Sequence, residues 1–332
     1  MKKLFALSIL FLSCTSHAQK SGYKLSNTFH IQSAGGWDYL AANPATHKLY
    51  VSHGTQVNIL DQKTGDSLGV ILNTPGVHGI AFVDAVKKGY ISNGRSNNLT
   101  VFDYTTDQVT TQIATGQNPD AIMYDAFSKM IYVCNGRSND LTVINPIDNK
   151  VTATIALGGK PETAVSDNAG KLFINIEDKN EVVVVDTKSM KVLSHWPLGA
   201  GSPTGLCIDT KTHRLFVGCE KTLVVMNSSN GKVVKTIPIG DGCDGTAFDP
   251  ATNLIFASNG EGTLSIIKEL SADKYEKLED LPTKQGARTI FLDEASHNVY
   301  LPAAEYEPQT DVTQRSRPKM IPGTFRILVL TK

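Results

Sequence analysis

Carboxylate side chains recur at one place in a repeated sequence pattern. Seven apolar stretches each end in an acidic or amide residue that serves as a landmark. The residues five positions before the landmarks are Asp38, Gly79, Asp120, Glu162, Thr204, Asp244 and Arg288. Carboxylates that lie close together in a concave site raise one another's pKa, which suits them to bind a cation or to transfer protons. The arginine at the seventh position could orient an anionic group in the same site.

Two further repeat positions hold residues that break a pattern. The position six residues before each landmark holds Trp37, His78, Pro119, Pro161, Pro203, Cys243 and Ala287. The position three residues after a recurring aromatic holds His53, Asn93, Asn135, Ile176, Cys219, Asn259 and Ala303. His53 and His78 depart from the two patterns together, as do Cys219 and Cys243. The repeat therefore predicts that the members of each pair are neighbours.

The histidine pair, with Asp38 nearby, suggests a metal site. Imidazole and carboxylate ligands suit zinc, copper or iron. The alternative is a hydrogen-bonded pair or a pair that polarises a substrate. The sequence favours this alternative, because it contains no short metal-ligand motif such as His-x-x-x-His. The cofactor stays undetermined, with a divalent metal as the candidate.

The cysteine pair predicts a disulfide if the protein is in an oxidising compartment. A bridge between Cys219 and Cys243 would close a loop of about 25 residues and, if unstrained, would stabilise the fold by roughly 3 kcal/mol in the chain-entropy model. The alternative is two separate buried thiols.

Charged residues also lie in the turns that follow the aromatic positions. Asn93-Gly94-Arg95-Ser96-Asn97 and Asn135-Gly136-Arg137-Ser138-Asn139 are near copies, and Glu177 begins the corresponding turn of the next repeat. A tight turn explains Asn and Gly, but it does not explain an arginine at the same place in both turns. Arg95 and Arg137 could hold a carboxylate or phosphate in a bidentate manner, or they could pair with the carboxylates described above.

The elements that must position these residues form a repeat of about 41 residues, a period typical of propellers. The landmarks are Asn43, Asp84, Asp125, Asp167, Asp209, Asp249 and Asp293. Each unit contains four short apolar or β-branched stretches separated by turn residues, and no stretch has a sustained helical period. Four strands per unit predict an all-β, seven-bladed β-propeller of four-stranded antiparallel blades. In such a ring the loop before the first strand and the loop between the second and third strands lie on one face, where the residues above should surround the mouth of the central channel.

The last repeat contains only three obvious strands. The stretch from 23 to 31 near the N-terminus alternates in polarity and has no blade of its own. We predict that it supplies the fourth strand of the last blade and so closes the ring, which removes an open sheet edge.

The first 18 residues predict a secretory signal. Lys2 and Lys3 precede a short apolar run, and Ser16-His17-Ala18 provides small residues at the cleavage positions. The run is too short for a membrane span, which needs about 20 residues. A lipid anchor on Cys14 is the weaker alternative, because Phe11-Leu12-Ser13 matches a lipobox poorly. We therefore expect an exported protein, periplasmic or extracellular, with one propeller domain over residues 19–332.

The overall charge limits the choice of partner. The chain has 32 basic and 32 acidic residues, and removal of a leader that contains Lys2 and Lys3 would leave it slightly acidic. Domains that bind nucleic acid usually carry a clustered basic excess, so a nucleic-acid partner is not favoured. We expect a monomer.

One motif connects the repeat to a known family. Tyr132-Val133-Cys134-Asn135, with the variants Tyr90-Ile91-Ser92-Asn93 and Phe256-Ala257-Ser258-Asn259, is followed by a β-branched run. This resembles the YVTN-repeat (YncE-like) propellers, a family of exported bacterial proteins, over about residues 30 to 332. The resemblance implies a binding or scaffold protein. One member of that family is reported to bind single-stranded DNA, and neighbouring propeller families include lactonases.

The sequence thus predicts a scaffold that binds a small molecule or a protein partner through the channel mouth. The alternative is a metal-dependent, lactonase-like hydrolase or lyase, built from Asp38, His53, His78, Asn135 and Glu162. No Gly-x-Ser-x-Gly motif or glycine-rich phosphate loop is present. A second alternative is single-stranded DNA binding.

Overall fold

The computed structural model describes residues 20–33, 35–307 and 319–332. The predicted leader, its boundary at residue 18 and the candidate lipid-anchor residue Cys14 lie outside the described residues. Within them, no helix is long and apolar enough to cross a bilayer.

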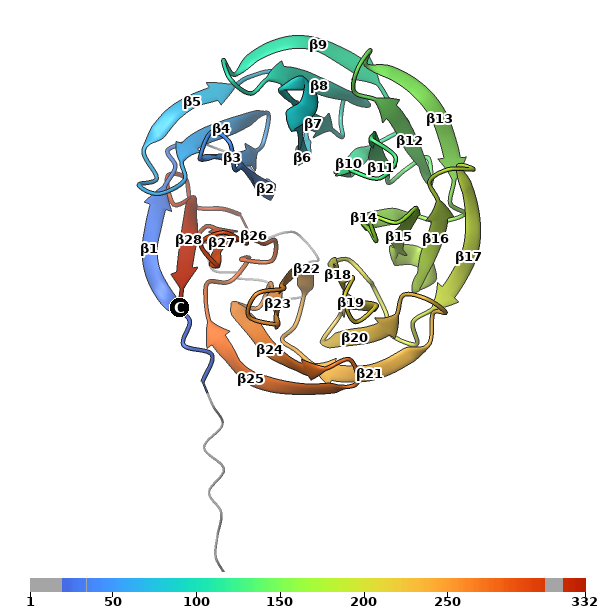
Figure 1. The fold of residues 1–332 in the computed structure, drawn as a ribbon. Coiled ribbons are helices and arrows are strands. Elements are labelled where there is room, and N and C mark those ends of the chain that lie inside the picture. Colours follow the sequence, from blue (N-terminus) through green and yellow to red (C-terminus); the bar gives the residue numbers. More distant parts are fainter. Residues whose placement is uncertain (1–19, 34, 308–318) are drawn as a thin grey trace, which may run out of the picture.

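Seven four-stranded antiparallel sheets form a ring around a central channel, which confirms the predicted propeller (Figure 1). In blades 1 to 4 the strands run in chain order from the channel to the rim. Blade 1 contains β2 (Trp37–Asn43), β3 (Lys48–His53), β4 (Gln56–Asp61) and β5 (Ser67–Ile71). Blade 2 contains β6 (Val77–Val83), β7 (Lys88–Asn93), β8 (Asn98–Asp103) and β9 (Gln108–Ala114). Blade 3 contains β10 (Pro119–Asp125), β11 (Met130–Asn135), β12 (Asp140–Asn145) and β13 (Lys150–Ala156). Blade 4 contains β14 (Pro161–Ser166), β15 (Lys171–Ile176), β16 (Glu181–Asp186) and β17 (Lys191–Pro197).

The remaining blades follow the same plan. Blade 5 contains β18 (Leu206–Asp209), β19 (Arg214–Cys219), β20 (Thr222–Asn227) and β21 (Val233–Pro238). Blade 6 contains β22 (Cys243–Asp249), β23 (Leu254–Asn259), β24 (Thr263–Ser271) and β25 (Lys274–Pro282). Blade 7 contains β26 (Phe291–Asp293), β27 (Asn298–Ala303), β28 (Arg326–Thr331) and, from the other end of the chain, β1 (Lys24–His30). The described residues also form two short 3-10 turns, η1 (Asp84–Val86) and η2 (Glu177–Lys179).

The core lies between neighbouring blades. The recurring aromatics lie on the second strand of each blade, and six of the seven are at most 1% exposed. They are Tyr50, Tyr90, Tyr132, Phe173, Phe216 and Phe256. The third strands are buried on both faces, as β16 is over its four consecutive valines. β-branched residues suit such strands, because their side chains pack well on a pleated surface covered on both sides.

The N-terminal strand closes the ring as predicted. β1 pairs antiparallel with β28, and Phe29 lies opposite Ile327. The Phe29 side chain is 3% exposed and packs between blades 7 and 1. Gly65 lies directly over this ring, with φ +79°, and a Cβ there would come within 2.2 Å of Phe29 Cδ1. The closing strand is therefore covered by a turn of blade 1.

The innermost strands carry an irregularity that decides which residues face the channel. In blade 1 Trp37 pairs with His53 and Leu40 with Val51, so Asp38 and Tyr39 together oppose one residue of β3. Blades 2, 3 and 4 have the same shift, and blade 6 has a related one. A β-bulge of this kind re-aims a side chain, and here it turns the bulge residues toward the channel.

The bulges correct the register predicted from the sequence in blade 2. Val77 pairs with Asn93 just as Trp37 pairs with His53, so His78, and not Gly79, is equivalent to Asp38. The error arises from the landmark. Val83 occupies the position that the polar landmark holds in blade 1, and Asp84 lies one residue later in the 3-10 turn.

Candidate functional site

Seven equivalent residues surround the channel mouth, one from each blade. In corrected register they are Asp38, His78, Asp120, Glu162, Thr204, Asp244 and Arg288. Hydrogen bonds between blades hold the backbone of this ring. Ser92 of blade 2 donates to the Asp120 carbonyl at 2.5 Å, and Thr289 of blade 7 donates to the Asp38 carbonyl at 2.6 Å. The ring residues are therefore positioned by the blades on either side.

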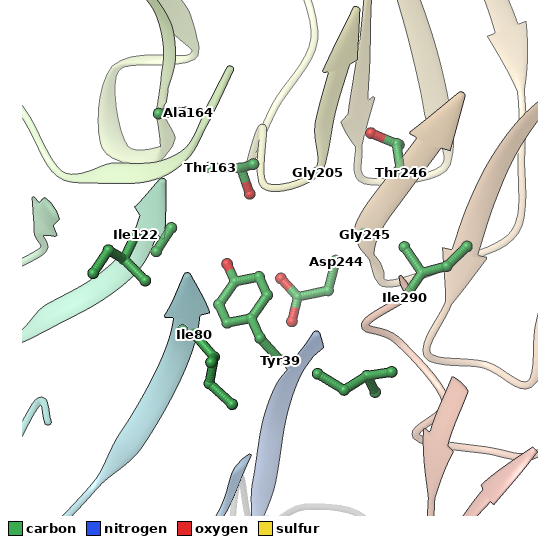
Figure 2. A pocket seen from close by; sticks show the side chains of 13 residues that line it. Tyr39, Ile80, Ile122, Thr163, Ala164, Gly205, Asp244, Gly245, Thr246 and Ile290 are labelled. Carbon is green, nitrogen blue, oxygen red and sulfur yellow. The ribbon is translucent and has the colours of Figure 1, made fainter. Parts of the chain in front are cut away.

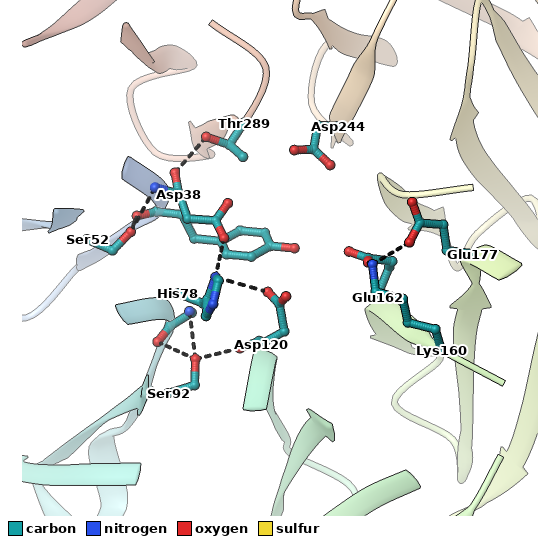
Figure 3. Close-up of polar contacts among 12 residues, drawn as sticks. Asp38, Ser52, His78, Ser92, Asp120, Lys160, Glu162, Glu177, Asp244 and Thr289 are labelled. Atoms are coloured by element: carbon teal, nitrogen blue, oxygen red, sulfur yellow. Dashed lines mark hydrogen bonds and ion pairs between the residues drawn. The ribbon is translucent and has the colours of Figure 1, made fainter. Parts of the chain in front are cut away.

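Asp38, His78 and Asp120 converge on one side of the mouth (Figure 3). His78 Nδ1 lies 2.5 Å from Asp38 Oδ2 and 3.6 Å from Asp120 Oδ1. The other ring nitrogen, Nε2, faces the turn of its own blade, where a Cβ on Gly94 would come within 2.7 Å of it. Glycine is thus required at that place for the imidazole to fit. One ligand atom from each of the three residues lies within 4.8 Å of the other two, close enough for all three to share a metal ion.

The charge of this cluster is poorly balanced. Burial raises the pKa of Asp120 to about 7, the Asp38 carboxylate adds to that rise, and His78 opposes it. Burial alone would lower the pKa of His78, but the hydrogen bond to Asp38 and the charge of Asp120 outweigh burial, and the pKa is raised. Among the described residues, the Asp120 carboxylate accepts no hydrogen bond, and its ion-pair contact with His78 Nδ1 is 3.6 Å long. The cluster therefore favours any added positive charge.

The opposite side of the mouth contains its own cation (Figure 3). Lys160 Nζ lies 2.6 Å from Glu162 Oε1 and forms a second, shorter ion pair with Glu177. Burial and the Asp120 charge raise the pKa of Glu162 despite Lys160, whereas the pKa of Lys160 itself is raised by its two partners. The raised pKa of Glu162 favours its protonated form, whereas the raised pKa of Lys160 depends on a charged Glu162. One ammonium lies between the two carboxylates and balances one of their two negative charges, so this group contains a permanent cation of its own.

Blade 6 contributes a further carboxylate, Asp244, which is paired with Arg288 of blade 7. Arg288 Nε lies 2.6 Å from Asp244 Oδ2, and its Nη2 lies 3.7 Å from Asp38 Oδ1. Burial raises the pKa of Asp244, and Arg288 opposes that rise. The arginine predicted to orient an anionic ligand is thus already engaged by carboxylates.

Below the ring the channel contains a cavity of about 190 Å³ lined mainly by apolar residues. Tyr39 extends into it near Asp244 and the side chains of Ile80 and Ile122 (Figure 2). Burial raises the pKa of the Tyr39 hydroxyl, and the surrounding carboxylates add to that rise. The cavity is smaller than the roughly 300–1,000 Å³ of typical drug-sized ligand sites, so it suits water, an ion or a small group of a larger ligand.

Two predicted site residues do not reach the channel. His53 is fully buried, its Nδ1 lies 2.5 Å from Ser33 Oγ, and its Nε2 lies 2.8 Å from the Gly35 carbonyl. Asn135 is also fully buried and donates to Asp140 at 2.6 Å and to Thr142 at 2.8 Å, inside its own blade. His53 occupies the equivalent position in blade 1, which is why it cannot join His78. The predicted metal-ligand set is therefore corrected, with Asp120 in place of His53.

Arg95 and Arg137 lie on exposed turns of the mouth face. In the part of the chain that the structure describes, neither guanidinium group forms an ion pair or a hydrogen bond. The prediction that they pair with the mouth carboxylates is not met there, and their use by an anionic ligand stays a prediction.

The four described cysteines are free thiols, so the structure does not contain the predicted bridge between Cys219 and Cys243. Both residues are buried, and Cys243 Sγ would lie 2.7 Å from a Cβ on Gly218, the residue before Cys219. Burial raises the pKa of both thiols. Disulfide formation in the mature protein stays a prediction.

Sequence reasoning missed two residues of the mouth. Lys160 precedes the proline that begins β14, and Tyr39 follows Asp38 in the bulge. Both are adjacent in sequence, or nearly so, to a ring residue. A search that included both flanks of each ring position would have found them.

Comparison with known proteins supports the fold alone. No family model matches the chain, and no curated protein sequence matches it. Among solved structures, hydrazine synthase of Kuenenia stuttgartiensis is similar with a TM-score of 0.71 at 17% identity, over 82% of this chain and 94% of that one. The WD40 repeats of RRP9 are similar with a TM-score of 0.77 at 12% identity, over 94% of this chain and 99% of that one. At these identities the likeness shows a propeller.

Proposed function

We propose that this protein is an exported binding scaffold related to the YVTN-repeat propellers, and that its channel mouth holds a positively charged group of a small molecule or protein partner. Propellers commonly serve as rigid platforms whose function depends on the site and not on the fold. The leader-like first 18 residues and the Tyr-Val-x-Asn repeats support the assignment to exported proteins of this family.

The observation that carries the proposal is the excess of carboxylates at the mouth. Two cationic side chains, Lys160 and Arg288, face five carboxylates. These carboxylates are Asp38, Asp120, Glu162, Glu177 and Asp244. His78 adds at most one further positive charge. A concave site lined by one sign of charge attracts ligands of the opposite sign.

The test is calorimetric titration of the protein in EDTA with spermidine, and with succinate as a probe of opposite charge. We expect spermidine to bind and succinate not to bind, and Asp244→Asn to weaken spermidine binding about tenfold. Glu220→Gln is the matched control, since Glu220 is an exposed carboxylate on the same face. Tighter binding of succinate, or no loss in Asp244→Asn, would contradict the proposal.

A lactonase-like hydrolase or lyase is the second candidate. It is favoured by Asp120, whose pKa is raised to about 7, since a group that titrates near neutral pH suits acid–base chemistry. Of the five residues predicted for that activity, Asp38, His78 and Glu162 lie at the mouth. A screen of lactones and esters, with Asp120→Asn as the loss-of-function variant, would decide between binding alone and catalysis.

Single-stranded DNA binding is less well supported, because the mouth carboxylates would repel phosphates. Exposed basic side chains of this face, among them Arg95, Arg137 and Lys221, could contact phosphates. DNA contacts by such residues predict salt-sensitive retention on a DNA resin. Failure to bind at low salt would exclude this function.

A further inference from the structure

We propose that Asp38, His78 and Asp120 bind a divalent transition-metal ion such as Zn²⁺ at the channel mouth. The inference rests on the proposed function, since it names the cation that the mouth would hold. The ligand set contains Asp120 in place of His53, because His53 contacts Ser33 away from the channel.

The first argument is geometry. Zinc lies about 2.0–2.2 Å from nitrogen and oxygen ligands, so its neighbouring ligand atoms in tetrahedral geometry are about 3.3–3.6 Å apart. Here His78 Nδ1 lies 2.5 Å from Asp38 and 3.6 Å from Asp120, and each ligand atom lies within 4.8 Å of the others. Small side-chain movements would therefore suffice to bring all three onto one ion.

The second argument is rigidity. The three residues come from the bulges of β2, β6 and β10, in adjacent blades. Ser52 receives the Asp38 N–H at 3.2 Å, and Ser92 receives the Gly79 N–H at 2.8 Å. Gly94 allows the imidazole to point Nδ1 at the two carboxylates. A metal site needs ligands held on rigid elements in this way.

The third argument is charge. Glu162 and Glu177 share Lys160, and Asp244 has Arg288. Asp38 and Asp120 have His78 between them, and Asp38 has a longer contact of 3.7 Å with Arg288. A divalent ion would displace the proton that Nδ1 shares with Asp38 and would neutralise both carboxylates, as metal binding to protonated ligands releases protons.

The ligand types indicate the class of ion. Imidazole with carboxylates suits zinc, copper or iron, whereas calcium and magnesium prefer oxygen ligands alone. Three protein ligands leave further coordination positions for water or for a donor atom of the bound partner. The metal would therefore form part of the ligand-binding surface.

The test is calorimetric titration of the full mature chain, stripped with EDTA and freed of chelator, with ZnCl₂ and with MgCl₂. We expect one zinc ion per chain and at least about a hundredfold weaker magnesium binding. His78→Gln and Asp120→Asn should each weaken zinc binding at least about a hundredfold, since even outer partners of metal ligands cost 10–100-fold. Unfolding midpoints measured in EDTA would show that both variants still fold.

The matched control is His195→Gln. His195 Nδ1 lies 2.8 Å from Glu181, so it forms a comparable histidine–carboxylate pair on the exposed strand β17. We expect zinc binding to be unchanged in this variant. Zinc binding lost in His195→Gln, or retained in both channel variants, would overturn the metal site. Spermidine binding without zinc binding would overturn the metal site alone, and absence of both would remove the proposed function as well.

Discussion

The two sides of the channel mouth both gather carboxylates but balance their charge differently. On the side of blade 4, one lysine bridges Glu162 and Glu177. On the side of blades 1 to 3, Asp38 and Asp120 have a histidine between them, whose charge depends on pH. A ring of equivalent residues therefore need not form a uniform site. The side of blade 4 contains a permanent cation, and the side of blades 1 to 3 remains available to an added one.

The closing strand β1 holds blades 7 and 1 together, and so holds the ring that forms the mouth. Phe29→Ala should cost about 3–5 kcal/mol, because it leaves a cavity at a buried aromatic position. The free energy of unfolding from urea titration would measure the loss. Leu25→Ala is the control, since Leu25 lies on the same strand and is 54% exposed. Equal, small effects of both variants would show that β1 does not close the ring.

Lys160→Met would remove the cation that pairs with Glu162 and Glu177. Removing one partner of a buried ion pair costs about 3–5 kcal/mol, and the partial exposure of Lys160 should reduce this to about 1–2 kcal/mol at pH 8. Lys221→Met removes an exposed pair with Asp241 and should cost less than about 0.5 kcal/mol. Urea titration of both variants would make the comparison. A Lys160 variant as stable as the wild type would mean that the Lys160 charge does not stabilise its two partners.

Asp120→Asn would show how much the ionised Asp120 carboxylate destabilises the side of blades 1 to 3. The folded state raises the pKa of Asp120 to about 7, so the wild type loses stability as pH rises from the unfolded value near 4 to the folded value. Asparagine cannot ionise and avoids this loss. In EDTA, the variant should therefore be more stable than the wild type by up to about 4 kcal/mol at pH 8, since one pKa unit corresponds to about 1.4 kcal/mol, and nearly equal to it at pH 4.

Unfolding midpoints at the two pH values would measure this effect. The charges that face Asp120 are those of Asp38, His78, Lys160, Glu162 and Asp244. Glu220→Gln is the control and should show no pH-dependent difference. An Asp120 variant that is less stable at pH 8 would mean that the carboxylate is already compensated in the metal-free protein.

The sequence was sufficient to predict the architecture, because the repeated positions are those that each blade must bury. Each blade must bury both faces of its sheet, so the aromatic and β-branched positions recur and reveal the blades even where loop lengths vary. The closing strand was also predictable, since the last repeat lacked a strand and the N-terminal stretch lacked a blade.

The site was only partly predictable, because a one-residue bulge shift decides which side chain faces the channel. His78 was assigned to the wrong register since Asp84 and not Val83 carried the polar landmark. His53 was predicted to lie beside His78, but its place in the repeat is the buried position that asparagine holds in blades 2, 3 and 6. Lys160 lies two residues before Glu162, outside the repeat positions that showed a pattern, and its contact with Glu177 depends on the reach of its long side chain.

Anomalous diffraction from zinc-soaked crystals of the protein would show whether the side of the mouth formed by Asp38, His78 and Asp120 binds a cation. We expect one strong zinc peak among Asp38 Oδ2, His78 Nδ1 and Asp120 Oδ1, with no peak beside Lys160. A peak between Glu162 and Glu177, or none within the ring, would contradict it.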